Sequence, residues 1–374
     1  MLTSGKDRDN IHYNVSEDDG YNIPIVCILS PREPGKTTSI MLDKLYSGFK
    51  KGLPSVTMVN QAADITEEYR ASFEETINSF KNYEIHTKYP KHAQKNGMTT
   101  IMARFNDGEE WRPFIYIVSR NTPKTRLKRI NLGRVQCLWY DECNVDVSIG
   151  EKWPDNLGSK WNELYTTLAR ANYPDKLHFY MTGNFYTRYN PLLIYLGVNC
   201  NKLEIGKKLV HKKIKKLASM ELDFSVIVDC YQLKPELRDY ILSHNPGYIF
   251  DDTYEKYFEG KAIADEGLAI EEKQPQSYKI NRVFKVGQRY LYIYRKDLDV
   301  NNGTWPKYWL DVQNKRPISK TVYCTNLTDL IGNTFLSKPF KNMFDGLRYA
   351  IARNDLSFSS PEAYYLMQEI YQSI

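Results

Sequence analysis

The sequence predicts an α/β protein whose main sheet is mostly parallel and covered by helices on both faces. Apolar, strand-like runs alternate with helical patterns between about residues 23 and 184. A glycine-lysine-threonine loop follows the first of these strands, and an acidic pair ends a later one. Alternating strands and helices are typical of βαβ units, which build a parallel sheet.

The first half of the chain supplies the elements of this sheet. Residues 1 to about 20 are polar and are expected to form a flexible or draped arm. We expect strands at residues 23–29, 55–59, 98–105, 113–118, 134–140 and 177–181, and helices at residues 38–49, 66–81 and 161–171. The turn Asn106-Asp107-Gly108 predicts a hairpin between two of these strands.

The pattern changes after about residue 205. A basic run at residues 207–216 is followed by helical segments at 234–244 and 251–264 and by a polar linker at 270–277. Further strands are expected at 279–286, 289–295, 307–312 and 319–324, and helices at about 338–353 and 361–373. Strands followed by helices predict a second α+β or α/β domain.

Composition limits the class of protein. The 374 residues are 42% hydrophobic, which is enough for packed cores in two or three domains. The net charge of +6 permits a polyanionic partner without requiring one. The six Cys show no CxxC spacing, so neither a zinc site nor a disulfide framework is expected, and Cys27 and Cys137 are expected to be buried. No run is long and apolar enough to predict a membrane span.

The loop after the first strand resembles a nucleotide-binding P-loop. The pattern is G-x-x-x-x-G-K-S/T, and this chain has Ser30-Pro31-Arg32-Glu33-Pro34-Gly35-Lys36-Thr37, followed by Thr38. Backbone N–H groups and the helix N-terminus would hold the phosphates of ATP, Lys36 would reach the β- and γ-phosphates, and Thr37 would bind Mg²⁺. We expect Glu33 to point away from the phosphates. The alternative is a surface turn that caps a helix.

A second motif predicts hydrolysis. Asp141-Glu142 ends an apolar strand, as a Walker B motif does. Asp141 would hold Mg²⁺, and Glu142 would orient and polarise the attacking water. The alternative is an acidic helix cap. Together the two motifs predict a P-loop NTPase of the ASCE, RecA-like kind.

Two further residues are candidates for the same site. Asn184 follows the next core strand, where it or Thr182 would sense the γ-phosphate; an ordinary turn is the alternative. Arg170 lies near the end of a helix and would serve as an arginine finger for a neighbouring subunit. A solvated arginine at a helix C-terminus is an equally good interpretation.

At these motifs the chain resembles the viral DNA-packaging ATPases of the terminase type, above all the encapsidation ATPases of small phi-twenty-nine-like podophages. The resemblance rests on S-P-R-E-P-G-K-T, L-W-Y-D-E, L-A-R-A-N before T-G-N, and R-Y-N-P-L-L-I-Y. It covers about residues 20 to 200. It implies that Lys36, Thr37 and Asp141 bind Mg-ATP, that Glu142 is catalytic, that Arg32 is a γ-phosphate switch and that Arg170 acts in trans.

The resemblance also implies a domain plan and partners. The plan is a P-loop ATPase domain at residues 1–231, a small helical linker at 232–272 and an RNase H-like domain at 273–374. The implied partners are double-stranded DNA, a viral portal on the procapsid and further copies of the chain in a ring. For the small podophages of this family, a structural RNA is also implied. The implied location is the host cytoplasm and, transiently, the procapsid. The two prolines of the loop depart from the glycine-rich pattern of the small phages.

The second domain is expected to lack nuclease activity. Its strand at Arg289–Arg295 carries Tyr and Arg where a metal-binding acid would stand, and Asp297, Asp299 and Asp311 are expected at strand ends or in turns.

The basic loop with Lys124, Arg126, Lys128 and Arg129 is the expected DNA contact, and the run at residues 207–216 is a second candidate; a solvated face is the alternative for both. Two other functions remain open: a P-loop nucleotide kinase, and a nucleic-acid-binding scaffold with a degenerate P-loop.

Overall fold

The structure is a computed structural model. It describes residues 12–31, 33–90, 98–120, 122–127, 132–145, 157–217, 220–244, 268–287, 289–296, 305–325, 329–335, 345–353 and 355–373. The chain forms two compact units. The first contains Met1–Tyr186 and Leu203–Ile263, and the second contains Thr187–Lys202 and Ala264–Ile374. A 16-residue segment after the β7 strand therefore belongs to the second unit, although the chain returns to the first unit after it.

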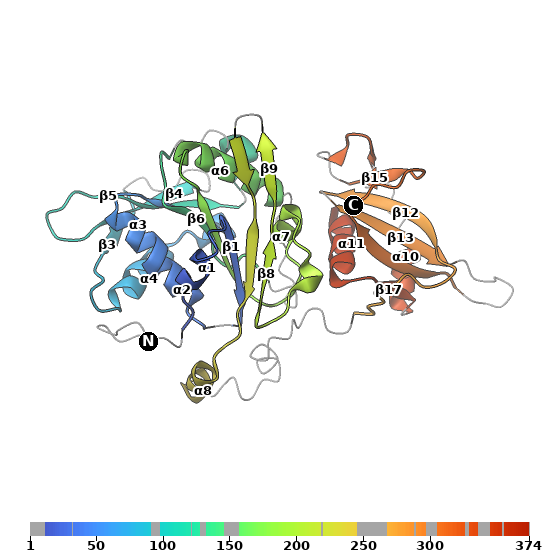
Figure 1. Ribbon diagram of the computed structural model, residues 1–374, viewed down its shortest axis with the longest axis horizontal. Coiled ribbons are helices and arrows are strands. Elements are labelled where there is room, and N and C mark those ends of the chain that lie inside the picture. Colours follow the sequence, from blue (N-terminus) through green and yellow to red (C-terminus); the bar gives the residue numbers. More distant parts are fainter. Residues whose placement is uncertain are drawn as a thin grey trace. The chain divides into compact units, whose positions relative to one another are not determined.

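The first unit is built on one nine-stranded sheet (Figure 1) with the order β3-β4-β5-β2-β6-β7-β1-β11-β8. The strands are β1 (Ile25–Ser30), β2 (Ser55–Val59), β3 (His86–Lys88), β4 (Met98–Arg104), β5 (Arg112–Ser119), β6 (Cys137–Tyr140), β7 (His178–Asn184), β8 (Lys207–His211) and β11 (Val226–Cys230). The central strands β5, β2, β6, β7, β1 and β11 are parallel to one another. At one edge β4 pairs antiparallel with β5, and β3 pairs antiparallel with β4; at the other edge β8 pairs antiparallel with β11. A separate hairpin pairs β9 (Ile214–Leu217) with β10 (Met220–Asp223).

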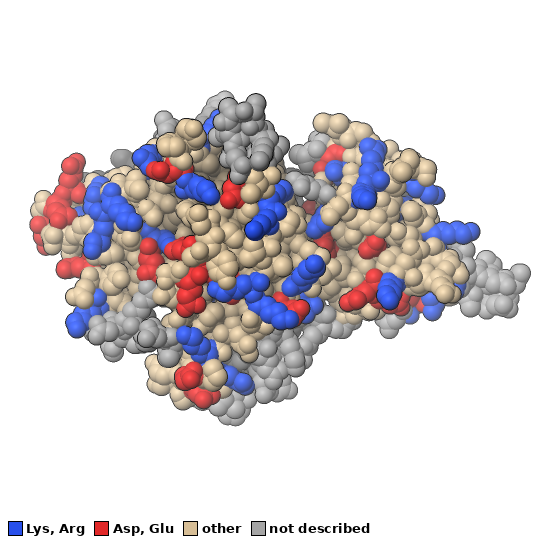
Figure 2. All heavy atoms as spheres, viewed as in Figure 1, with Lys and Arg blue, Asp and Glu red and all other residues tan. Residues whose placement is uncertain are grey.

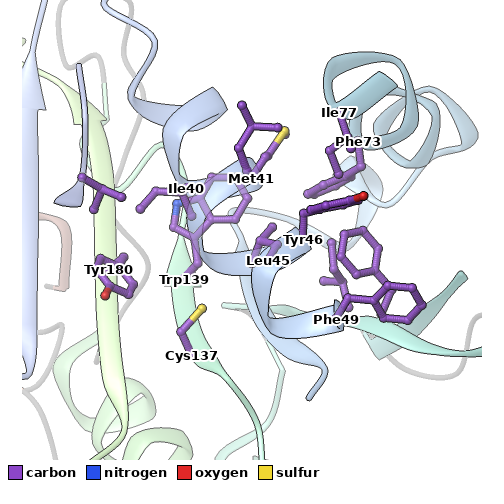
Figure 3. Close-up of a cluster of buried hydrophobic side chains, with 14 of the residues drawn as sticks. Ile40, Met41, Leu45, Tyr46, Phe49, Phe73, Ile77, Cys137, Trp139 and Tyr180 are labelled. Atoms are coloured by element: carbon purple, nitrogen blue, oxygen red, sulfur yellow. The ribbon is translucent and has the colours of Figure 1, made fainter. Parts of the chain in front are cut away.

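A long helix begins in the loop that resembles a P-loop and covers one face of this sheet. It runs through α2 (Lys36–Ile40), a π-helical stretch η1 (Met41–Tyr46) and α3 (Ser47–Lys50). It packs beside α4 (Glu67–Asn78), whose N-cap Thr66 accepts a hydrogen bond from Tyr69 N–H. Figure 3 shows side chains of this helix gathered with those of α4 and of the strands β6 and β7. The cluster includes Ile40, Leu45, Phe49, Phe73 and Trp139.

The opposite face of the sheet is covered by α6 (Leu157–Asn172). Its Trp161 stacks on Tyr165 and contacts Phe179 of β7, with ring centroids 5.4 Å from Phe179. Tyr180, the next residue of β7, belongs to the cluster on the other face, as the two-residue period of a strand requires. The expected mainly parallel sheet with helices on both faces is therefore confirmed.

The second unit contains a mixed sheet with the order β16-β15-β12-β13-β14-β17. Its elements are α7 (Pro191–Leu196), η4 (Cys200–Lys202), β12 (Lys279–Val286), β13 (Arg289–Lys296), β14 (Lys307–Gln313), β15 (Val322–Cys324), β16 (Thr334–Phe335), α10 (Asp345–Ala352), β17 (Leu356–Phe358) and α11 (Pro361–Ser373). The strands β12, β13 and β14 are antiparallel, whereas β15, β16 and β17 join in parallel.

The segment Thr187–Lys202 is held in this second unit by side-chain contacts. Tyr189 stacks on Tyr365 of α11 with ring centroids 4.5 Å apart, and its hydroxyl donates to Glu369 at 3.3 Å. Asn190 caps α7 by accepting hydrogen bonds from Leu192 N–H and Leu193 N–H. The sequence pattern did not indicate that this segment leaves the first unit.

A buried ion pair lies next to this segment. Arg289 and Glu362 are both buried and stand 3.1 Å apart, and Arg289 also donates to the Val198 carbonyl at 3.4 Å. Burial raises the pKa of the Glu362 carboxyl, while the Arg289 charge opposes the shift. Such a pair resists separation, because either charge alone would be buried without a partner.

Several expectations need correction. Of the two expectations for the N-terminal arm, residues 12–20 match the draped one and not the flexible one, because Tyr13 and Val15 are buried against the first unit and α1 (Ser16–Asp19) follows. Part of the basic loop at 120–129 is the short helix α5 (Lys124–Leu127), anchored by buried Leu127.

In the second domain, the position of Asp311 and the place of the polar linker also differ from the expectation. Asp311 lies inside β14, opposite Tyr292, rather than at a strand end, because the strand continues to Gln313. Asp297 and Asp299 lie outside the described residues. The polar linker at 270–277 begins inside the second unit, because Ile270 bridges Phe358 and the Glu271 carbonyl accepts a hydrogen bond from Trp309.

The linker domain at 232–272 stays a prediction, since it contains α8 (Pro235–His244) and residues 245–267, which lie outside the described part. All six Cys are buried, which confirms the burial expected for Cys27 and Cys137. No helix in the described part of the chain is long and apolar enough to cross a membrane.

Candidate functional site

The predicted site residues meet at one edge of the first sheet. The loop with Gly35-Lys36-Thr37 follows β1, Asp141 follows β6, and Asn184 ends β7. These three strands are adjacent and parallel in the order β6-β7-β1. Because parallel strands end at the same edge, the topology brings residues far apart in sequence together.

Lys36 is buried and its ammonium group is surrounded by oxygen atoms. Nζ donates to Ser30 Oγ at 3.1 Å, to the Pro31 carbonyl at 3.3 Å and to Asn184 Oδ1 at 2.9 Å. The structure thus joins the first residue of the loop, its lysine and the residue at the end of β7.

The loop itself has a constrained backbone. Gly35 is the N-cap of α2 and adopts a left-handed conformation with φ of 84°. Glu33 is also left-handed, with φ of 66°, and its side chain is exposed. Pro31 and Pro34 are buried, and Thr38 lies half-buried in the first turn of α2. Arg32 lies outside the described residues, so its role as a switch stays a prediction.

Thr37 and Asp141 lie side by side, as the predicted metal site requires. Thr37 Oγ1 donates to Asp141 Oδ1 at 3.3 Å. The same oxygen accepts from Thr182 Oγ1 at 2.7 Å and from Glu142 N–H at 3.0 Å. Burial raises the pKa of the Asp141 carboxyl, and the hydrogen bond from Thr182 and the Lys36 charge oppose the shift.

A second layer holds this carboxylate in place. Trp139 of β6 is fully buried, and its Nε1–H donates to Thr182 Oγ1 at 2.8 Å. The Thr182 hydroxyl therefore accepts from Trp139 and donates its own hydrogen bond to Asp141. The sequence does not reveal this role of Trp139, because it depends on which strand lies beside β6. The L-W-Y-D-E run located the strand but gave no partner for its tryptophan.

Glu142 is exposed at the sheet edge and adopts a left-handed backbone with φ of 50°. Such a conformation is unusual for a residue other than glycine and is found most often at functional sites. Its carbonyl accepts a hydrogen bond from Asn60 Nδ2 at 3.5 Å. Asn60 in turn accepts from the Tyr140 hydroxyl at 3.1 Å.

Gly183 is a further residue that sequence reasoning missed. A Cβ built there would lie 2.9 Å from Cys143 Sγ and 3.1 Å from Asn144 N, so only glycine lets the loop after Glu142 approach β7. The Cys143 N–H donates to the Thr182 carbonyl at 2.9 Å, and Asn144 Nδ2 donates to the Asn184 carbonyl at 3.1 Å. The sequence signal was the run Thr182-Gly183-Asn184, which the structure places at the end of β7.

Arg170 does not approach these residues within its own chain. It is exposed in the last turn of α6, where its Nε–H donates to the Thr166 carbonyl at 3.3 Å. Two residues later, Asn172 bonds Val135 just before β6, which places this helix end at the opposite edge of the sheet. The role of Arg170 toward a neighbouring subunit stays a prediction.

The basic segments give little support for a DNA surface. Lys128 and Arg129 lie outside the described residues, and Lys124 and Arg126 lie on α5. Lys207 and Lys208 of the second run lie on the edge strand β8. Lys207 pairs with Glu204, and Lys208 pairs with Asp18 and Asp229. On the face shown in Figure 2, blue and red side chains are interspersed among the described residues.

The donors at the sheet edge fit Mg²⁺. Thr37 Oγ1 and the Asp141 carboxylate are hard oxygen ligands, which this cation prefers. Mg²⁺ keeps several waters and takes few protein ligands, so a site of two side chains suits it. No cluster of three or more His, Cys, Asp or Glu able to hold a metal occurs among the described residues.

Comparison with known proteins identifies a shared fold. No protein-family model matches the sequence, and no curated protein matches it. The chain is similar to a solved structure described as the Phi-28 gp11 DNA packaging motor, with a TM-score of 0.58 and 16% identity over 95% of this chain and 96% of that chain. It is also similar to a chain of the bacteriophage Phi-29 viral genome packaging motor assembly, with a TM-score of 0.56 and 16% identity over 97% and 99%. This protein therefore has the α/β fold of components of phage DNA-packaging motors.

Proposed function

We propose that this protein is a Mg²⁺-dependent ATPase that drives double-stranded DNA into a viral procapsid as a subunit of a ring motor. The observation that carries the proposal is the arrangement of Lys36, Thr37, Asp141 and Asn184 at one edge of three adjacent parallel strands. A P-loop and a Walker B motif form one site only when their strands end at the same edge.

Each side chain has a role that its position supports. Lys36 would bind the β- and γ-phosphates in place of its present oxygen partners, Ser30 and Asn184. Thr37 and Asp141 would hold the Mg²⁺, which neutralises phosphate charge when it is bound. Glu142, exposed beside them, would orient a water molecule and accept its proton.

The link to DNA packaging rests on the fold. Both similar structures are named as parts of DNA-packaging motors, and the likeness extends over nearly the whole chain. Double-stranded DNA, a ring of copies, a portal and a structural RNA are accordingly the partners we propose. An RNase H-like character of the second unit belongs to the same proposal, and its mixed sheet flanked by α10 and α11 is compatible with it.

ATP hydrolysis with and without double-stranded DNA tests the proposal. We expect Lys36→Ala to abolish ATP binding and Glu142→Gln to keep binding while lowering turnover by about 10²- to 10⁴-fold, the usual contribution of a general base. The matched controls are Lys51→Ala and Glu110→Gln, which change exposed residues outside the site. Failure of wild type to bind ATP, or full turnover in Glu142→Gln, would contradict the assignment.

A further inference from the structure

The segment His12–Asp19 lies against the P-loop and the helix that follows it. The Tyr13 N–H donates to the Pro34 carbonyl at 2.7 Å, and the Val15 N–H donates to Ser39 Oγ at 2.9 Å. A Cβ built on Gly35 would lie 3.2 Å from the Cβ of His12. We call this segment the N-terminal brace, because it contacts the stretch from Pro34 to Ser39 at three points.

One end of the brace is anchored by a buried polar network. Asp18 is fully buried and accepts a hydrogen bond from the Tyr13 hydroxyl. Asp18 also pairs with Lys208 of β8 at 2.6 Å, and Lys208 pairs with Asp229 of β11 at 3.1 Å. This network joins the brace to β8, the outermost strand of the sheet, and to its neighbour β11.

A second anchor joins the brace to the P-loop helix. Asp19 pairs with Lys44, which lies in the π-helical stretch of that helix. The other carboxylate oxygen of Asp19 accepts from the Tyr180 hydroxyl at 2.9 Å. Lys44 and Tyr180 are buried, and the Asp19 side chain that they share is 34% exposed, so these contacts are only partly shielded from water.

The hydrogen bond to the Pro34 carbonyl has a direct consequence for phosphate binding. A trans peptide is planar, so its C=O and N–H point in opposite directions. When Tyr13 holds the Pro34 carbonyl on the outer side of the loop, the Gly35 N–H points to the other side. Pro31 and Pro34 supply no N–H themselves, which makes the orientation of each remaining donor more important.

The loop also needs external support. Glu33 and Gly35 are both left-handed, and for Glu33 that conformation is strained because its side chain crowds the backbone. A strained backbone persists only where its surroundings hold it. Lys36 holds the loop from within through Ser30 and Pro31, and the brace contacts it from outside.

We propose that the N-terminal brace is part of the nucleotide site and that Tyr13 and Asp18 are positioning residues that set its affinity for a nucleoside triphosphate. The inference rests on the proposed function. Tyr13 fixes the peptide between Pro34 and Gly35, and Asp18 fixes Tyr13 through its hydroxyl. Neither side chain is required to touch the nucleotide.

The test removes one hydroxyl group from the full-length protein. Tyr13→Phe keeps the ring but loses the hydrogen bond to Asp18. The matched control is Tyr231→Phe, because the Tyr231 ring contacts Tyr13 at 5.2 Å while its hydroxyl has no hydrogen-bond partner among the described residues. We expect Tyr13→Phe to weaken binding of a fluorescent ATP analogue with Mg²⁺ about tenfold and Tyr231→Phe to leave it unchanged.

A readout without nucleotide separates this inference from the proposed function. Amide hydrogen exchange at Gly35–Ser39 should be faster in Tyr13→Phe than in wild type, and Asp18→Asn should lie between the two because its amide oxygen still accepts from Tyr13. If Tyr13→Phe lowers the melting temperature but leaves both the exchange at Gly35–Ser39 and the affinity for the ATP analogue as in wild type, the proposed role of the brace is wrong. If wild type binds no ATP, the proposed function fails, and faster exchange in Tyr13→Phe would still support the brace as the support of the loop.

Discussion

Gly183 gives the sharpest test of how tightly the site is packed. It lies between Thr182 and Asn184 at the end of β7, and its backbone does not require glycine, because its φ is not positive. A Cβ there would stand 2.9 Å from Cys143 Sγ and 3.1 Å from the backbone nitrogen of Asn144. The thiol has some freedom to rotate, but the backbone atom moves only if the loop moves.

Gly183→Ala therefore tests the loop that carries Glu142. Overpacking of this kind costs about 1 to 3 kcal/mol, so we expect the free energy of unfolding in urea to fall by that amount. Displacing the loop by a few tenths of an ångström also moves Glu142, so turnover should fall while Lys36 still binds ATP. Gly20→Ala is the control, since a Cβ there meets only an ordinary contact at 3.7 Å.

The same substitution can be partly reversed. Cys143→Ala removes the Sγ contact but leaves the Asn144 nitrogen, so the double variant with Gly183→Ala should recover part of the lost stability. Wild-type stability and turnover in Gly183→Ala would refute the reasoning, because the loop would then accommodate the added methyl group without losing stability or displacing Glu142.

Three further predictions use groups away from this loop. Burial and the neighbouring Asp18 raise the pKa of Asp229 to about 6, so the folded protein binds a proton that the unfolded chain has released. The free energy of unfolding should therefore rise by about 1 kcal/mol as the pH falls from 7 to about 5, and this rise should be absent from denaturant unfolding of Asp229→Asn. Arg289→Met should destabilise the second unit by about 3 to 5 kcal/mol, because it leaves the buried Glu362 carboxylate without its partner. Adding Glu362→Leu should restore most of the lost stability. Equal losses in the single and the double variant, measured by calorimetry, would contradict this. Arg170→Ala should leave the free energy of unfolding within about 0.5 kcal/mol of wild type, because the residue is exposed. The same variant should abolish ATPase activity in the assembled ring, and a fully active ring would exclude the role in trans.

The sequence was sufficient for five of the six central strands, and it selected residues of three of them that the structure brings together. Ile25–Ser30 and Cys137–Tyr140 are apolar runs that end in recognisable motifs, so both their place and their direction follow. The strand β11 was missed, although Val226–Cys230 is a short run rich in β-branched residues. It follows a charged stretch without a motif, and nothing local shows that it pairs with β1.

The second layer of the site was not predictable in the same way. The bond from Trp139 to Thr182 and the approach of Cys143 to Gly183 join neighbouring strands, so they exist only once the strand order is fixed. The acidic residues Asp18 and Asp19 looked like part of a solvated arm for a similar reason. Their cationic partners, Lys208 and Lys44, lie far away in sequence.

The placement of Thr187–Lys202 in the second unit affects how the chain can be made and divided. As the ribosome releases the protein, α7 emerges long before Tyr365 and Glu369, the α11 residues that hold Tyr189. Until α11 follows, Tyr189 lacks these neighbours, while β8 and β11 are still needed to complete the first sheet. A fragment cut at about residue 231 would keep the candidate site but would carry Thr187–Lys202 without the rest of the second unit, and we expect it to aggregate unless this segment is replaced by a polar connection.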